Sequence, residues 1–142
     1  MTPPPGILAA MVILLFPMGY FFLAAPAFLL VRLDIPQVTQ LLRGMFNIQF
    51  VMMSVAGGIA ALAFLAAGRP LFAAIVGLVA AFAFLSRRRF MDKMDAQLEA
   101  RDSGDANAVR RLRRLHWGGM LCNAVELVAI VSSIPYIVVA PA

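Results

Sequence analysis

The sequence predicts an all-α polytopic membrane protein whose four transmembrane helices form an antiparallel bundle. Of its 142 residues, 63% are hydrophobic and 13% are charged, whereas soluble domains are nearer to half apolar and a quarter charged. The apolar residues gather in four long runs. Most of the net charge of +5 lies in one connection between two runs, which indicates a topology signal and not a nucleic-acid surface. We therefore expect a single transmembrane domain over residues 1–142.

The first span is expected over residues 7–31, and no charged side chain precedes Arg32. The run is long enough to cross about 30 Å of hydrocarbon. Pro17 and Pro26 each remove a backbone donor, so the helix should kink or break near one of them. The run is too long for a signal peptide and has no basic segment before it, so we expect a retained helix.

The second and third spans are expected over residues 45–67 and 71–86. A polar connection, 32–44, precedes them, and the "GRP" sequence at 68–70 predicts a tight turn between them, since Gly ends helices and Pro begins them. The third span is short, and strong helix formers follow it. We therefore expect that helix to continue out of the bilayer.

A cytoplasmic helical hairpin is predicted over residues 87–114. The "SGDAN" sequence at 103–107 is its loop, and the fourth span follows over 115–139. We expect the acids of the first arm to pair with arginines at the start of the fourth helix. These acids are Asp92, Asp95, Glu99 and Asp102.

The basic residues predict the orientation. Residues 32–44 and 87–114 together hold eleven Lys and Arg side chains, whereas Arg69 alone lies on the opposite side. Positive charge is enriched in cytoplasmic loops. Both termini should therefore be periplasmic, in a bacterial inner membrane.

Small residues at four-residue spacing predict where helices approach each other, because helices in lipid associate through close packing and polar contacts. They form one stripe on each of the last three spans. The stripes are Gly57 and Ala61, then Ala73, Gly77 and Ala81, then Gly118 and Cys122.

Polar side chains inside the second and fourth spans form the main candidate site. Glu126 lies near the middle of the fourth span, and His116 and Asn123 share its side of the helix. One hypothesis is a proton relay or ligand site; the favoured one is a protonated Glu126 that hydrogen-bonds an amide and holds helix register. The predicted intramembrane polar cluster is Asn47, Gln49, Ser54, Asn123 and Glu126.

His116 is the one candidate for cofactor binding. Its imidazole suits a haem iron or the magnesium of a chlorophyll-type pigment. A hydrated anchor or hydrogen-bonding role at the interface, beside Trp117, is the favoured interpretation. One Cys and one His do not make a structural metal site, so we predict no metal.

The arginines of the hairpin lie where anionic lipid headgroups lie, so they are candidates for lipid or partner contact as well as for topology anchoring. They are Arg87, Arg88, Arg89, Arg110, Arg111, Arg113 and Arg114.

No catalytic motif is present in the sequence, and we expect no enzyme activity. The predicted function is a non-enzymatic accessory or assembly subunit of a larger membrane complex, associated with other membrane subunits or with copies of itself. The alternative is a small transporter or a haem-, pigment- or metal-binding protein that uses the polar cluster.

The fourth helix resembles a known family. "RRLHWGGMLCNAVEL" is similar to the L-H-x-x-S-x-x-x-N-x-x-x-L signature of the transmembrane-protein-205-like family through Leu115, His116, Asn123 and Leu127, with Gly119 where the family has serine. The segments "GYFFLAAPAF" and "LLRGMFNIQF" are also similar to its first and second helices. The resemblance implies the same four-helix membrane fold and no particular activity.

Overall fold

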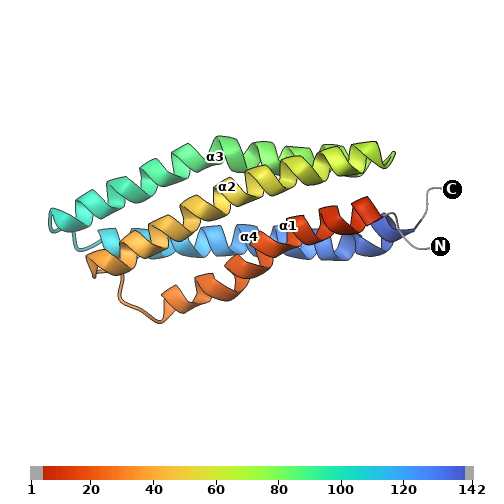
Figure 1. The fold of residues 1–142 in the computed structure, drawn as a ribbon. Coiled ribbons are helices and arrows are strands. Elements are labelled where there is room, and N and C mark those ends of the chain that lie inside the picture. The colour runs from red at the N-terminus through yellow and green to blue at the C-terminus, as the bar shows by residue number, and fades with distance from the viewer. Residues whose placement is uncertain (1–4, 140–142) are drawn as a thin grey trace.

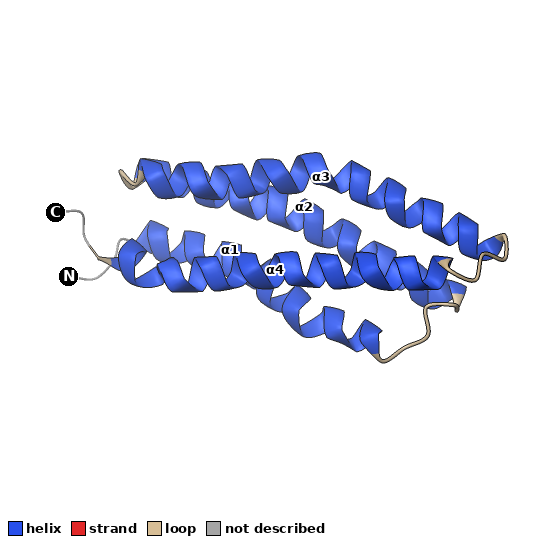
Figure 2. Ribbon diagram, turned by 180° about the vertical axis from the view of Figure 1, so that it is seen from behind, coloured by secondary structure: helices blue, strands red, loops and turns tan. Residues whose placement is uncertain are grey.

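The computed structural model of the chain describes residues 5–139 and is all-α. Helix α1 spans Pro5–Ala24 and continues into a short 3-10 helix, η1, at Ala25–Leu29; α2 spans Pro36–Ala66, α3 spans Pro70–Asp102 and α4 spans Ala108–Val138 (Figures 1 and 2). Within the described residues, four helical segments are long and apolar enough to cross a membrane. The predicted all-α class and the four long apolar helices are confirmed.

Two helices extend well beyond their apolar spans. Helix α3 continues without a break through Arg87–Arg89 to Asp102, as predicted. Helix α2 begins at Pro36, so most of the predicted polar connection 32–44 is helical. The fixed φ of proline and its missing N–H suit the first turn of a helix, which explains this early start.

Helix α1 breaks at Pro26, which is one of the two predicted positions. It passes through Pro17 without ending, and it changes to the 3-10 form at Ala25. A proline inside a helix removes one hydrogen bond and clashes with the preceding turn. The break turns the end of η1 away from α2 and α3 (Figure 1).

The beginning of α1 and the end of α4 lie at one end of the molecule, together with the α2–α3 turn (Figures 1 and 2). The Arg69 guanidinium of that turn donates to the carbonyl oxygen of Tyr136 at 3.2 Å and also to that of Val139. These bonds satisfy carbonyls that the end of a helix leaves free. The loop between α3 and α4 lies at the other end (Figure 1).

Helices α2 and α3 lie side by side along most of their length (Figure 1). A Cβ added to Gly57 would lie 2.8 Å from the Cβ of Ala80, so the two backbones approach closely there. The buried stripe of α3 consists of Ala73, Val76, Ala80 and Ala83. The predicted stripe through Ala81 is therefore wrong at that residue, which is exposed.

The small-residue stripe predicted for α4 is also wrong. Gly118 and Cys122 are exposed, and nothing lies within 4 Å of a Cβ added to Gly118. The close approach is instead made by Gly119, where an added Cβ would overlap the ring of Phe46. The stripe is one residue away from the prediction, because α4 is rotated so that His116 and Asn123 face inward.

The start of α2 is joined to the far half of α3 by charged contacts. Arg43 donates to both carboxylate oxygens of Asp95, at 2.5 and 2.7 Å, and Arg101 donates to the Thr39 hydroxyl at 2.5 Å. Asp95 thus pairs with α2 and not with α4, which corrects the predicted pairing. The carboxylate that does pair with an arginine of α4 is Asp105, which accepts from Arg111 at 2.5 Å.

Gly57→Leu is expected to destabilise the protein by about 1–3 kcal/mol, because the added side chain separates α2 from α3. Gly58→Leu is the matched control, since nothing lies within 4 Å of a Cβ at Gly58. The measurement is unfolding by titration of sodium dodecyl sulfate into mild-detergent micelles. Equal unfolding midpoints for the two variants would contradict the close approach.

Asp95→Asn is expected to lower stability near neutral pH and to reduce its decline in acid. The hydrogen bonds from Arg43 lower the pKa of Asp95 below its ordinary value. A lowered folded-state pKa gives stability that is present above the unfolded value of about 4 and is lost as pH falls through the folded value. Melting curves from pH 6 to pH 3 measure this. Asp92→Asn, whose carboxyl makes no salt bridge within residues 5–139, should leave the decline unchanged.

Candidate functional site

Two buried amides join three of the helices. The Gln49 amide nitrogen donates to the Asn123 side-chain oxygen at 3.1 Å, and the Asn123 amide nitrogen donates to the Met18 carbonyl at 3.2 Å. Gln49 is 9% exposed and Asn123 5%. Buried amides need such partners, because an unpaired polar group in an apolar environment is costly. The pair therefore ties α1, α2 and α4 together.

Helix periodicity explains the position of Gln49. The buried stripe of α2 repeats at three- and four-residue spacing through Leu42, Phe46, Gln49, Met53, Ala56, Ala60 and Phe64. Gln49 is the polar member of this stripe, and it lies where two apolar clusters meet. Gln49 was predicted to form one cluster with Asn47 and Ser54, but Gln49 is buried in the core and the other two are only partly buried.

The other polar residues of α2 lie apart from the amide pair. Asn47 accepts from the Arg87 guanidinium at 2.9 Å, which links α2 to α3 near the end of the apolar span. The Ser54 hydroxyl donates at 2.7 Å to the Phe50 carbonyl of its own helix. The five residues of the predicted cluster are therefore not one site, and only Gln49 and Asn123 hydrogen-bond each other.

Glu126 lies in a cleft of about 280 Å³ between α3 and α4, with α2 at its base. The cleft is mainly apolar, and Gln49, Ser86, Cys122 and Asn123 also contribute to its lining. Glu126 is partly exposed, and Cys122, one turn before it, is exposed. Within residues 5–139, no hydrogen bond or salt bridge joins the Glu126 carboxyl to another side chain, so the expected bond to an amide is not formed.

His116 is completely buried, at 0% exposed. Its Nε2 lies 2.9 Å from the Ala25 carbonyl, and since a carbonyl only accepts, Nε2 carries the proton. The edges of the Phe28 and Phe46 rings enclose the imidazole, and the buried Nδ1 has no partner in the described part of the chain. The predicted hydrogen-bonding role of His116 is confirmed and the predicted hydrated anchor is wrong, whereas the neighbouring Trp117 is 55% exposed.

His116 and Arg113 together hold the broken end of α1. The Arg113 guanidinium donates to the carbonyls of Phe28 at 2.7 Å and Val31 at 3.0 Å. These are among the carbonyls that the end of a helix leaves without partners. Sequence reasoning missed this role, although the signal was present: Pro26 predicts the break, and residues 113 and 116 share one face of α4.

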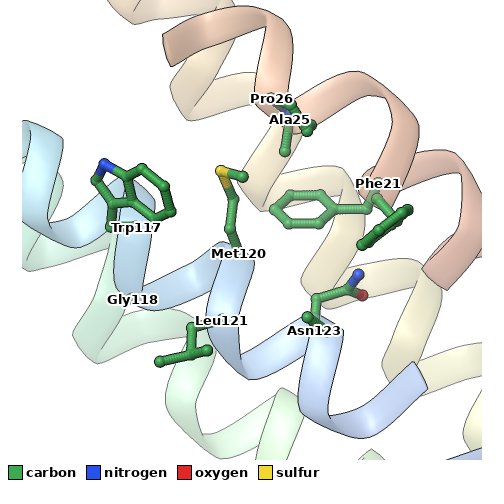
Figure 3. A pocket seen from close by; sticks show the side chains of 10 residues that line it. Phe21, Ala25, Pro26, Trp117, Gly118, Met120, Leu121 and Asn123 are labelled. Atoms are coloured by element: carbon green, nitrogen blue, oxygen red, sulfur yellow. The ribbon is translucent and has the colours of Figure 1, made fainter. Parts of the chain in front are cut away.

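A second hollow, of about 430 Å³, separates the end of α1 and η1 from α4. Its lining is apolar, with Met120 pointing toward Ala25 and Pro26, and Asn123 pointing toward Phe21 (Figure 3). Trp117 and Leu121 form its side on α4 (Figure 3).

The seven arginines predicted to contact lipid or a partner divide into two groups. Arg87, Arg111 and Arg113 hydrogen-bond to groups of this chain, with Arg111 contacting Gln97 as well as Asp105. The others form no hydrogen bond or salt bridge with the described residues. These are Arg88, Arg89, Arg110 and Arg114.

The four apolar helices indicate a small multi-pass membrane protein. Comparison with protein-family models, curated proteins and solved structures finds no match to this chain. Among residues 5–139, no group of three or more His, Cys, Asp or Glu side chains is placed to hold a metal ion.

Replacing either amide should destabilise the protein, and the two effects should not add. Asn123→Leu removes both hydrogen bonds and Gln49→Leu removes one, so Asn123→Leu should cost more. The coupling energy from a double-mutant cycle should be about 0.6–2 kcal/mol, the range for hydrogen bonds between membrane helices. Ser54→Ala is the control, because its hydroxyl bonds only its own helix. Additive effects in detergent unfolding would rule out the pairing.

Proposed function

We propose that this chain is a non-enzymatic accessory or assembly subunit that binds another membrane protein, or a second copy of itself, through the cleft between α3 and α4. The observation that carries the proposal is Glu126, an intramembrane carboxyl with no hydrogen-bonding partner among residues 5–139, in a cleft that includes the exposed Cys122.

An acid at the centre of a bilayer costs about 2.5–3.5 kcal/mol on the insertion scale, so such residues face a protein or a water cavity. The amides in reach of the same cleft are already engaged, since Gln49 and Asn123 bond each other and α1. A polar side chain from a neighbouring helix would supply the missing partner, because polar contacts are a main source of helix association in lipid.

The same features argue against the alternatives. A proton relay needs successive polar groups, whereas Gln49 and Asn123 form a closed connection and His116 is bonded to Ala25. Haem or pigment ligation by His116 would use the lone pair of Nδ1, but this nitrogen is buried, so the ring's surroundings would have to open to admit a cofactor. The buried polar residues are better explained as structural contacts.

We infer an antiparallel bundle in a bacterial inner membrane, with the 87–114 hairpin cytoplasmic and both termini periplasmic. The distribution of eleven basic residues against one supports this orientation. The bonds from Arg69 to the end of α4 support the arrangement, since they bring the α2–α3 turn to the end where α4 finishes. Membership of the transmembrane-protein-205-like family is proposed mainly on the fourth-helix residues.

Cys122, the only cysteine of the chain, allows a direct test. A thiol-reactive photocrosslinker on Cys122 in native membranes should form a discrete protein adduct. Glu126→Leu should reduce its yield about 3–30-fold, which corresponds to one interhelical hydrogen bond, whereas Glu126→Gln, which still hydrogen-bonds, should retain most of it.

The positional control moves the label to another exposed residue. Cys122→Ser with Leu62→Cys places it on α2, where Leu62 is 69% exposed, and should give no such adduct. An adduct of twice the chain mass would identify the partner as a second copy. Adducts with lipid alone, or a protein adduct unaffected by Glu126→Leu, would overturn the proposal.

A further inference from the structure

A third hollow, of about 450 Å³, lies between the outer half of α3 and the start of α4. Four polar side chains line it: Lys93 and Gln97 from α3, and Arg111 and Arg114 from α4. Phe90, Leu115 and Gly118 form its apolar side. Arg111 is held by Gln97 and Asp105, but the four salt bridges within residues 5–139 do not include Lys93 or Arg114. The hollow therefore carries two cations that no carboxylate neutralises.

The charged groups of Lys93 and Arg114 are directed toward the same depth relative to the membrane. Side chains tilt toward the N-terminus of their own helix. From α3, which leaves the apolar span near Ser86, Lys93 therefore tilts back toward the membrane. From α4, Arg114 tilts away from the apolar segment that begins at Leu115. Both ammonium and guanidinium groups thus approach the headgroup layer, which is about 5–8 Å thick on each side of the hydrocarbon.

The apolar side of this hollow continues into the membrane. Phe90 and Gly118 line both this hollow and the α3–α4 cleft, so the two are contiguous. Nothing lies within 4 Å of a Cβ added to Gly118, so the space beside this residue is open.

We propose that this hollow is a binding site for one anionic phospholipid, with its phosphate between Lys93 and Arg114 and an acyl chain passing Phe90 and Gly118. Charge complementarity selects the anionic headgroup, and the apolar continuation selects a lipid over a soluble anion or an acidic protein segment. The proposal does not rest on Glu126, which lies eight residues, or about 12 Å, beyond Gly118 along α4.

The headgroup part is tested by native mass spectrometry of the purified full chain in neutral detergent with added phosphatidylglycerol. The wild type should retain one molecule, and phosphatidylcholine should be retained far less. Lys93→Gln with Arg114→Gln should weaken binding about thirtyfold, as expected for two cations near an anionic surface. Arg88→Gln with Arg89→Gln removes the same charge from exposed positions outside the hollow, and should change binding by less than about threefold.

The acyl part is tested with Gly118→Leu, which fills the open space beside this residue without touching either cation. It should reduce phosphatidylglycerol retention while leaving the melting temperature in detergent unchanged. Inorganic phosphate should not compete at millimolar concentration.

Four results would overturn the site. They are equal loss in the Lys93/Arg114 and Arg88/Arg89 double variants, equal retention of phosphatidylcholine, undiminished retention in Gly118→Leu, and displacement of the lipid by inorganic phosphate. The first would indicate diffuse attraction to the whole hairpin, and the last a soluble-anion site.

Discussion

A polar backbone group at membrane depth needs a partner within the protein, because hydrocarbon supplies none. Pro26 creates this need in α1, where the helix becomes a 3-10 turn and then ends. Residues of α4 meet it: His116 bonds the Ala25 carbonyl and Arg113 bonds two carbonyls beyond it. These contacts fix the rotation of α4 about its own axis. That rotation determines which of the other side chains of α4 face inward.

Asn123 lies seven residues after His116, and so nearly on the same side of the helix. Once His116 faces α1, Asn123 must also face inward, where it bonds Gln49 and Met18. Glu126 lies about 60° around the helix from Asn123. That offset places its carboxyl at the edge of the core and in the α3–α4 cleft, beyond the amides.

The apolar runs and the prolines predict the helices well, because both act locally along the chain. Helix α3 beyond Ser86 and the break at Pro26 are two examples. Contacts between helices depend on how each helix is rotated about its own axis. Residue spacing alone predicts which residue faces a neighbouring helix only to within about one position. Gly119 was therefore missed in favour of Gly118, and Gln49 was grouped with Asn47 and Ser54, which lie apart from it. Asp95 was assigned to α4, because the sequence does not reveal that α2 extends far enough to bring Arg43 beside it.

The cleft between α3 and α4 results from how the close contacts are distributed. On α3 the small residue Ala80 packs against Gly57 of α2, and Asp95 is bound to α2 as well. On α4, Gly119 is in contact with Phe46 of α2. Ala80 and Gly119 thus both face α2, and the cleft is left between the neighbouring faces of α3 and α4. Close packing between α3 and α4 would require one of them to rotate away from α2, which the amide pair and the Arg43–Asp95 pair oppose. The cleft is therefore a consequence of the same contacts that stabilise the fold.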